Sequence, residues 1–589
     1  MRDAQDVRNG LQFARIPIID ARPQRTDVHR ERKGEGKRAC AHATEAEGQA
    51  RATTPVMQSS LPHTPRVVIA EQFAERGLAV LREHGIDIDS QVGRTRAELV
   101  HALAEADGLI VRSETRVDRD LLAAGPKLSV VARAGVGVDA IDVDAATDAG
   151  IIVLNTPGAN TIAATEQTFA LMLSLVRRTP AAVQSLREGR WDRKPFIGTE
   201  LYGKTLGIVG LGRIGGSVAL RAKAFGMRVL AHDPYISAAR AGAFDADLVD
   251  LDTLLEQSDI VTLHVPLTLQ TTGMLDAARL AQLRPHAYVI NCARGGLIVE
   301  RDLIAALDAG TLAGAALDVV AVEPPPPGGT GAALHAHPNV VATPHLGGST
   351  HEALARIATE LAHDVARALL GAPANAAVNA PVPDGPEAER IFPFLDVAYR
   401  LGRFYPQYTR ATTLPRFALV LGGALADVPP APLIRAFLSG LLQATTDRRV
   451  SVVNAEAIAN ELGVAIDARG DAAESSYAAS LRLLAGGTSI AATSVGGSPR
   501  IVELDGYEID ATPVGAMLIT QHRDVPGMIG RVGTILGDAG VNISTMQVSR
   551  NTQGGDAIMV LSTDRPAGES TVGALRAVPG IASVRSLDV

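Results

Sequence analysis

A glycine motif, Gly210-Leu211-Gly212-Arg213-Ile214-Gly215, constrains the fold of this chain more than any other feature. A strand-like run at 205–209 precedes it, a helical run at 217–224 follows it, and a second strand-like run ends at Asp233, 23 residues past Gly210. In that context the glycines permit a tight turn and close approach of a pyrophosphate to a helix N-terminus. Asp233 can accept hydrogen bonds from a ribose diol and repels a 2′-phosphate. The motif therefore predicts a dinucleotide site for NAD rather than NADP.

Short β-branched runs alternate with helical periods on both sides of this motif. The first series of expected strands comprises residues 67–70, 108–111, 128–131 and 151–154, with a helix at 74–84. The second series comprises residues 205–209, 229–231, 260–263, 288–290 and 314–317. This β-α-β alternation predicts an α/β fold with two parallel, doubly wound sheets.

Length, charge and cysteine content narrow the possible classes of protein. A chain of 589 residues is too long for one core and suggests about three to four domains. The net charge of −8 argues against a general nucleic-acid binder. Two cysteines, Cys40 and Cys292, cannot form a disulfide framework or a zinc site by themselves, so we expect no metal and a cytoplasmic location. The longest apolar stretch, 161–176, is too short and too polar to span a membrane.

Residues 1–62 differ in composition from the rest of the chain. Between residues 1 and 56 there are eleven basic and eight acidic residues, few apolar ones and no sustained periodicity. This composition predicts a disordered N-terminal extension. The eight acidic residues argue against a transit peptide, and Met57 is an alternative working start of the chain.

Three polar residues that follow expected strands form a candidate reaction centre: Arg294, Glu323 and His345. The carboxyl ends of parallel strands meet at one sheet edge, where ligands bind in open α/β folds. Arg294, in a segment expected to open a helix, presents a planar fork to a carboxylate, and a histidine held by a glutamate is a general acid/base near neutral pH. Each residue also has a structural interpretation: a loop-capping arginine, a glutamate before a proline turn, or a structural histidine. Cys292 is expected to be an inert, small apolar residue.

The ordered motifs over about residues 65–589 resemble those of the D-isomer-specific 2-hydroxyacid dehydrogenases. The resemblance rests on the glycine motif with Asp233 and on the segments 263–266, 291–295, 318–324 and 343–350. Within this family the chain is similar to the long phosphoglycerate dehydrogenases, because segments 453–457 and 496–502 resemble their intervening domain and segment 517–543 resembles an ACT domain. The resemblance implies oxidation of D-3-phosphoglycerate with NAD, the first step of the phosphorylated route to L-serine.

The resemblance also assigns roles to individual residues. Arg294 is expected to bind the substrate carboxylate, His345 to accept the proton, and Glu323 to hold the imidazole. The implied cofactor-binding residues are Gly210, Gly212, Arg213, Ile214, Gly215, Asp233, Val265, Ala293, Asp318, His345 and Gly348. The implied substrate-binding residues are Arg112, Ser113, Gly137, Asn160 and Arg294. Arg112 is the candidate phosphate ligand, with a surface arginine at a turn as the alternative, and Arg193 is expected to reach a neighbouring active site.

A discontinuous domain organisation follows from the same resemblance. It comprises a flavodoxin-like substrate-binding domain at 63–158 and 346–380, a Rossmann-type NAD domain inserted at 159–345, an α+β intervening domain at 387–512, and a ferredoxin-like ACT domain at 514–589. A linker is expected at 381–386, and His345 is expected to lie at the hinge between the first two domains.

The ACT-like segment implies regulation by a small ligand. His522, Asp524 and Asn542 match its ligand-binding positions, and L-serine is the implied effector. A purely structural oligomerisation domain is the alternative, and the role of Arg500 stays open between an anion site and a spacer. The resemblance further implies a homo-oligomer, either a dimer or a tetramer.

Two other functions remain open at this stage. One is a different D-2-hydroxyacid dehydrogenase, such as a hydroxypyruvate or glyoxylate reductase, although such chains end soon after the region of His345. The other is a non-catalytic NAD-sensing regulator on the same fold, against which the complete set of Arg294, Glu323 and His345 argues.

Overall fold

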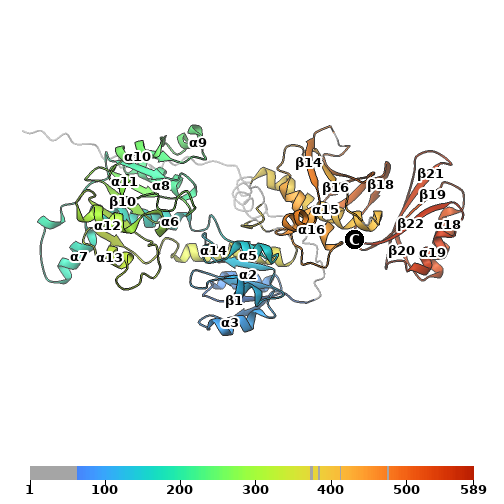
Figure 1. Ribbon diagram of the computed structural model, residues 1–589, viewed down its shortest axis with the longest axis horizontal. Helices are drawn as coiled ribbons and strands as arrows, with labels where there is room; N and C mark the ends of the chain where they lie inside the picture. Colours follow the sequence, from blue (N-terminus) through green and yellow to red (C-terminus); the bar gives the residue numbers. More distant parts are fainter. Residues whose placement is uncertain (1–62, 372–373, 375, 382–384, 411–412, 474–475) are drawn as a thin grey trace, which may run out of the picture. The chain divides into compact units, whose positions relative to one another are not determined.

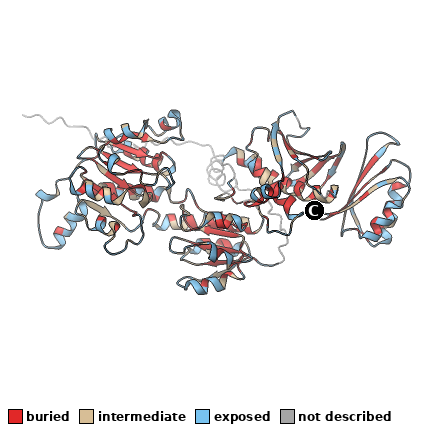
Figure 2. Ribbon diagram, viewed as in Figure 1, coloured by how far each residue is buried: buried red, intermediate tan, exposed pale blue. Residues whose placement is uncertain are grey.

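The computed structural model describes residues 63–371, 374, 376–381, 385–410, 413–473 and 476–589 (Figure 1). The extension expected at 1–62 lies outside the described residues, as does the middle of the linker expected at 381–386. Four sheets account for the strands of the described part, and Figure 2 shows buried residues both on the sheets and on the helices. No helix within the described residues is both long enough and apolar enough to cross a membrane.

The first sheet is parallel, with the strand order β2-β1-β3-β4-β5 that is typical of flavodoxin-like folds. Its strands are β1 (Arg66–Ile69), β2 (Asp87–Ser90), β3 (Gly108–Val111), β4 (Val130–Arg133) and β5 (Ile152–Leu154). Its helices are α2 (Glu75–Glu83), α3 (Arg96–Leu103), α4 (Arg119–Ala123) and α5 (Val143–Asp148). A helix from much later in the chain, α14 (His351–Leu369), contributes Ile357, Leu361 and Val365 to the same core as Val67 and Ile69. Its apolar face therefore completes this first core.

The second sheet is parallel, seven-stranded and of Rossmann type, with the order β12-β11-β10-β9-β6-β7-β8. Its strands are β6 (Thr205–Val209), β7 (Arg228–His232), β8 (Asp247–Leu248), β9 (Ile260–Leu263), β10 (Tyr288–Asn291), β11 (Gly314–Leu317) and β12 (Val340–Ala342). The surrounding helices are α6 (Thr161–Val176), α7 (Thr179–Arg187), α8 (Arg213–Ala224), α9 (Ala238–Gly242), α10 (Leu251–Gln257), α11 (Ala277–Leu280), α12 (Glu300–Asp308) and α13 (Thr330–Ala336). Two separate apolar cores hold all of these helices except α7 against the sheet.

The third sheet is six-stranded and mixed, with the order β14-β13-β15-β16-β17-β18. Its strands are β13 (Phe417–Gly423), β14 (Ile466–Asp471), β15 (Ala479–Ala485), β16 (Thr488–Val495), β17 (Ser498–Leu504) and β18 (Tyr507–Ala511). The helices α15 (Pro386–Thr409), α16 (Ala431–Gln443) and α17 (Ala455–Glu461) accompany it. Only β13 and β14 pair in parallel, which makes this an α+β domain.

The fourth sheet is antiparallel, with the order β20-β21-β19-β22. The elements run in the order β19 (Ala516–Arg523), α18 (Met528–Asp538), β20 (Ile543–Arg550), β21 (Asp556–Thr563), α19 (Glu569–Arg576) and β22 (Ile581–Asp588). This β-α-β-β-α-β order is that of a ferredoxin-like domain. Helices α18 and α19 pack against one face of this sheet. The other face places Met517, Ile519 and Leu587 in the same buried cluster as Phe417 of the third sheet, so the two sheets share a core.

Two local expectations from the sequence are wrong, and one strand was not predicted. Strand β2 was not expected, because its residues Asp87–Ser90 lack an apolar alternation and it is defined only by pairing with β1 at the sheet edge. Strand β4 begins at Val130, two residues later than expected. Residues 291–296 do not open an α-helix directly: a single 3-10 turn, Gly295–Leu297, intervenes before α12 begins at Glu300.

Candidate active site

The glycine loop joins β6 to α8, and steric contacts explain two of its glycines. Gly210 has φ +91°, and a Cβ there would lie 2.6 Å from the carbonyl oxygen of His264. A Cβ at Gly215 would lie 2.0 Å from the carbonyl oxygen of Gly210, so only glycine lets the helix approach the strand this closely. Gly212 is the N-cap of α8 and faces open space. The loop therefore leaves exposed backbone N–H groups at a helix N-terminus, which suits the pyrophosphate of a dinucleotide.

Two expected loop residues, Arg213 and Ile214, form the first turn of α8 instead of extended loop. Ile214 packs against the apolar core on that side of the sheet. Asp233 follows β7 and is only partly exposed. One of its oxygens accepts the Leu211 N–H at 2.9 Å and the other accepts the Tyr235 N–H at 3.0 Å. Each carboxylate oxygen keeps a lone pair for a ribose hydroxyl.

The loop after β12 is held by the buried carboxylate of Asp318, which is 1% exposed. One oxygen accepts the Thr343 hydroxyl at 2.5 Å and the Leu346 N–H at 2.8 Å, and the other accepts the Gly347 N–H at 2.7 Å. His345 lies between these anchors with φ +54°, a left-handed conformation that few non-glycine residues adopt. Asp318 thus fixes the backbone that presents His345, a role beyond the cofactor contact expected from the sequence.

His345 and Glu323 form a hydrogen-bonded pair. Nδ1 of His345 lies 2.7 Å from Oε2 of Glu323, and the side chains are 42% and 37% exposed. Partial burial raises the pKa of Glu323. The hydrogen bond and charge of His345, the Val320 N–H and the charge of Arg294 outweigh that burial, so the pKa lies below its ordinary value. The carboxylate therefore stays charged and leaves Nε2 of the imidazole for proton transfer.

Arg294 follows β10 and meets Asp139 from the first domain. Its Nε donates to Oδ2 of Asp139 at 3.0 Å, and Nη1 donates to the carbonyl of Ala293 at 2.7 Å. A Cβ at Gly137 would lie 1.8 Å from Nη2 of Arg294, so any side chain there would displace the guanidinium. This explains why glycine occupies the expected substrate position Gly137. The remaining N–H groups of Arg294 are those that can bind a carboxylate.

A second arginine, Arg133, was missed from the sequence. It ends β4 directly beside the end of β3, where the register pairs it with Val111, and its charge interacts with those of Arg112 and Arg294. Burial, then the charge of Arg294, lower the pKa of Arg133, and no described residue accepts a hydrogen bond from its guanidinium. The carboxyl ends of neighbouring expected strands could have revealed this arginine as a partner of Arg112. Three positive charges, those of Arg112, Arg133 and Arg294, therefore lie close together, an arrangement that suits an anion with more than one charge.

Glu71 anchors the loop that carries Arg112 and Ser113. Its carboxylate accepts backbone N–H groups from Arg112 at 2.8 Å, Glu114 at 3.2 Å and Thr115 at 3.0 Å. Burial raises the pKa of Glu71, but these hydrogen bonds outweigh it and the pKa is lowered. Ser113 is exposed at the end of this loop. The sequence did not predict this role of Glu71, because Glu71 lies 41 residues before Arg112, whose loop it holds.

Asn160 caps α6 next to Gly348: a Cβ at Gly348 would lie 3.3 Å from Nδ2 of Asn160. Its Oδ1 is buried and has no hydrogen-bond partner among the described residues. A buried amide without a partner costs free energy, so this atom is suited to a ligand donor. Val265 and Ala293 are partly buried against the same apolar core of the second sheet, and Val265 lies beside Gly210 of the glycine loop.

Burial moves the pKa values of two other groups in this region away from neutral pH. Burial lowers the pKa of His264 to about 4, and its Nε2 lies 3.0 Å from the Thr262 hydroxyl. Burial raises the pKa of Cys292 to about 12. The thiol is therefore protonated and unreactive at neutral pH, in line with the expectation of an inert residue.

The structure brings His522 and Asp524 together at the carboxyl end of β19, whereas Asn542 precedes β20 at the opposite end of the fourth sheet. His522 is buried in β19, with Nδ1 3.3 Å from the Thr520 hydroxyl, and burial lowers its pKa. Asp524 accepts hydrogen bonds from Arg550 at 2.8 Å and from the Gly554 N–H at 3.3 Å. Asn542 is exposed and donates its N–H to Asp564, and no hydrogen bond within the described part of the chain joins it to His522 or Asp524. Arg500 pairs with Asp510, so its charge is already compensated.

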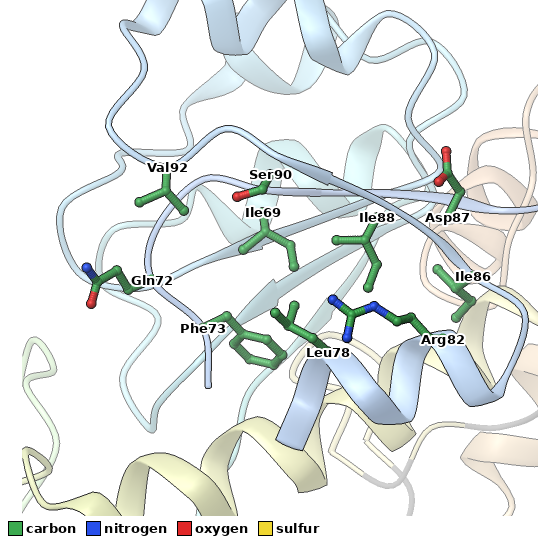
Figure 3. A pocket seen from close by; sticks show the side chains of 10 residues that line it. All are labelled: Ile69, Gln72, Phe73, Leu78, Arg82, Ile86, Asp87, Ile88, Ser90 and Val92. Atoms are coloured by element: carbon green, nitrogen blue, oxygen red, sulfur yellow. The ribbon is translucent and has the colours of Figure 1, made fainter. Parts of the chain in front are cut away.

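A cavity of about 520 Å³ lies away from this centre, at the β2 edge of the first sheet. Figure 3 shows Ile69 and Ile88 on the strands above Phe73, Leu78 and Arg82. None of the expected site residues lines it.

Three family models match consecutive parts of the chain. The NAD-binding domain of the D-isomer specific 2-hydroxyacid dehydrogenases matches residues 169–347, the D-3-phosphoglycerate dehydrogenase intervening domain matches residues 390–505, and the ACT domain matches residues 516–580. Among solved structures, the TT0316 protein from Thermus thermophilus is 37% identical with a TM-score of 0.49, over 53% of this chain and 99% of that chain.

Curated relatives extend the similarity to nearly the whole chain. The D-3-phosphoglycerate dehydrogenase of Synechocystis sp. is 42% identical over 88% of this chain and 93% of its own length. Those of Bacillus subtilis and Methanocaldococcus jannaschii are 40% and 39% identical, each over 89% of this chain and over 99% and 100% of their own lengths. This chain therefore belongs to the D-3-phosphoglycerate dehydrogenase family, the NAD-dependent D-2-hydroxyacid dehydrogenases with an intervening domain and an ACT domain.

Proposed function

We propose that this protein oxidises D-3-phosphoglycerate to 3-phosphohydroxypyruvate with NAD, and that His345 is the general base. The observation that carries the proposal is the 2.7 Å contact between His345 and Glu323, beside a guanidinium whose charge acts on Glu323. A regulator that only sensed NAD would need no acid/base pair. The intervening and ACT domains favour phosphoglycerate oxidation over hydroxypyruvate or glyoxylate reduction.

Different residues bind different groups of the substrate. Arg294 binds the C1 carboxylate, and its position against Gly137 directs the C2 oxygen toward His345. Arg112 and Arg133 bind the phosphate, because two guanidinium groups at adjacent strand ends match a dianion. The unpaired Oδ1 of Asn160 accepts one hydrogen bond from the substrate or the cofactor.

The chemical step needs one proton acceptor and one hydride acceptor. Nε2 of His345 takes the C2 hydroxyl proton, while the charged Glu323 at Nδ1 fixes the ring and stabilises the imidazolium. The bound NAD supplies the hydride acceptor. Gly210, Gly212 and Gly215 hold its pyrophosphate and Asp233 its ribose, with Val265 and Ala293 beside the nicotinamide. Arg294 keeps the carboxylate in place as C2 becomes planar.

The test is a substrate panel followed by NADH absorbance. Initial rates are measured with NAD and D-3-phosphoglycerate, D-glycerate or D-lactate, and in the reverse direction with hydroxypyruvate and glyoxylate. We expect kcat/KM for D-3-phosphoglycerate to exceed that for D-glycerate by at least about a hundredfold, because two charge-assisted phosphate contacts are lost. Equal values for the two acids would refute phosphate recognition by Arg112 and Arg133.

We also propose that L-serine binds at His522 and Asp524 of one subunit and at Asn542 of a second subunit, and inhibits the enzyme. Asn542 of the same chain lies at the opposite end of the sheet from His522. Asp524 can receive the ammonium group, and the free N–H groups at the start of α18, after the Gly527 turn at φ +84°, can receive the carboxylate. His522→Ala is expected to abolish inhibition by L-serine while leaving uninhibited turnover within about twofold. Unchanged inhibition would leave only a structural role for these residues.

We further propose a cytoplasmic homo-oligomer. Trp191 and Ile197 are 81% and 79% exposed on either side of Arg193, an arrangement that suits a subunit interface with Arg193 directed at a neighbouring site. Light scattering of the full chain is expected to give the mass of a dimer or a tetramer. The Trp191→Ala variant is expected to weaken the association of the subunits. A monomer at micromolar concentration would refute the homo-oligomer. Recovery of the protein outside the cytoplasmic fraction of fractionated cells would refute the cytoplasmic location.

A further inference from the structure

A cavity of about 490 Å³ lies where the third and fourth sheets share their core. Its polar lining includes Tyr408 near the end of α15, Asp505 in the turn between β17 and β18, Gln521 on β19, and Ser583 and Arg585 on β22. It contains neither the reaction centre nor the expected effector residues. A cavity of this size accommodates a small polar metabolite.

Two opposite charges line this cavity, and the described residues form no ion pair with either. The Asp505 carboxylate accepts the Ser489 N–H at 3.0 Å and the Tyr408 hydroxyl at 2.7 Å, both neutral donors. The Arg585 guanidinium donates Nε to the carbonyl of Tyr408 at 3.0 Å and Nη1 to the carbonyl of Val584 at 3.3 Å, both neutral acceptors. A partly buried charge without an opposite partner is costly, so each group favours a ligand of the opposite sign.

Neutral groups between the two charges are held in fixed positions. Ser583 donates its hydroxyl to Oε1 of Gln521 at 3.0 Å, and Nε2 of Gln521 lies 3.5 Å from the Tyr408 hydroxyl. This chain of contacts joins α15 to both β19 and β22. The backbone of Asp505 has φ +50°, so its carboxylate is presented from a tight turn. The cavity wall is therefore organised by hydrogen bonds from the elements that meet there.

We infer that this cavity is a second ligand site, which binds a small zwitterion of the α-amino-acid class. The ammonium group of the ligand pairs with Asp505 and its carboxylate with Arg585, while Gln521 and Ser583 contact a polar side chain. A ligand bound there contacts the intervening and ACT domains at once, so it stabilises their junction. This site is independent of the one proposed at His522.

Calorimetric titration of the full-length His522→Ala variant tests this site without contribution from the proposed effector site. The probes are glycine and L-serine, which carry both charges, and glycinamide and N-acetylglycine, which each lack one. We expect both zwitterions to bind and both single-charge analogues to bind at least about tenfold more weakly, because each loses a charge-assisted contact. Failure of glycine and L-serine to bind this variant, while they bind the wild type, would overturn the inference and assign all binding to His522.

Charge-removing variants identify the cavity as the place of binding. Asp505→Asn and Arg585→Gln are each expected to weaken glycine binding at least about tenfold, with NADH formation retained as evidence of folding. The matched controls are Asp447→Asn and Arg576→Gln, at exposed positions away from the cavity, and they should bind glycine like their parent. Arg585→Lys should recover part of the affinity. Unchanged affinity in both cavity variants would overturn the inference.

Discussion

Nδ1 of His345 lies 2.7 Å from Oε2 of Glu323, across 22 residues of sequence that include α13 and β12. The imidazole is presented from a left-handed backbone position, and the Asp318 carboxylate fixes the loop on both sides of it. A base on such a rigid loop needs little reorganisation when the substrate loses its proton. The geometry therefore suits a residue that takes up a proton in every turnover.

Glu323→Gln tests the positioning residue of this pair. The amide keeps the size of the side chain but not the charge that stabilises the imidazolium, so we expect kcat to fall by about ten- to a hundredfold while KM for NAD changes less than about twofold. Steady-state kinetics with Glu83→Gln, an exposed glutamate on α2, as control provide the measurement. A larger effect on KM for NAD than on kcat would contradict the assigned role.

Arg133→Met tests the arginine that adjoins Arg112. Removing one charge-assisted phosphate contact should raise KM for D-3-phosphoglycerate by about ten- to a hundredfold and change kcat/KM for D-glycerate by less than about threefold. Arg119→Met, at an exposed arginine of α4, is the control. Equal losses for both substrates would show that Arg133 acts on something other than the phosphate.

Glu71→Gln tests the anchor of the Arg112 loop. An amide offers only one acceptor oxygen to three N–H groups, so we expect KM for D-3-phosphoglycerate to rise about three- to tenfold. Because the folded pKa lies below 4.5, the stability that the carboxylate contributes is complete above that pH and is lost as the pH falls through the lower folded value. The ratio of the KM of Glu71→Gln to the KM of the wild type should therefore be constant from about pH 6 to about pH 9. A ratio that varies in this range would contradict a carboxylate that stays charged there.

Asp233→Asn tests the choice of cofactor. The amide still accepts the Leu211 N–H but no longer repels a 2′-phosphate, so the preference of kcat/KM for NAD over NADP should fall at least about tenfold. Asp252→Asn, at an exposed position on α10, should leave the preference unchanged. An intact preference in Asp233→Asn would place the discrimination elsewhere.

Local pattern was enough to predict much of the fold and part of the site. The glycine loop and the pair His345 and Glu323 follow expected strands, so the shared sheet edge alone predicted their neighbourhood. Asp139 and Arg294 are separated by 155 residues, and no local signal predicts their ion pair. Strand β2 was missed because the charged and polar residues of Asp87–Ser90 are compatible with an edge strand but do not identify one.

The most direct test of the central claim is the turnover of His345→Ala. The measurement is kcat for NADH formation from D-3-phosphoglycerate, together with the Kd of NAD from fluorescence quenching and His101→Ala on α3 as control. We predict that kcat falls at least about a hundredfold, while the Kd of NAD stays within about threefold of the wild-type value. A kcat within about threefold of the wild type, with NAD still bound, would show that His345 is not the proton acceptor.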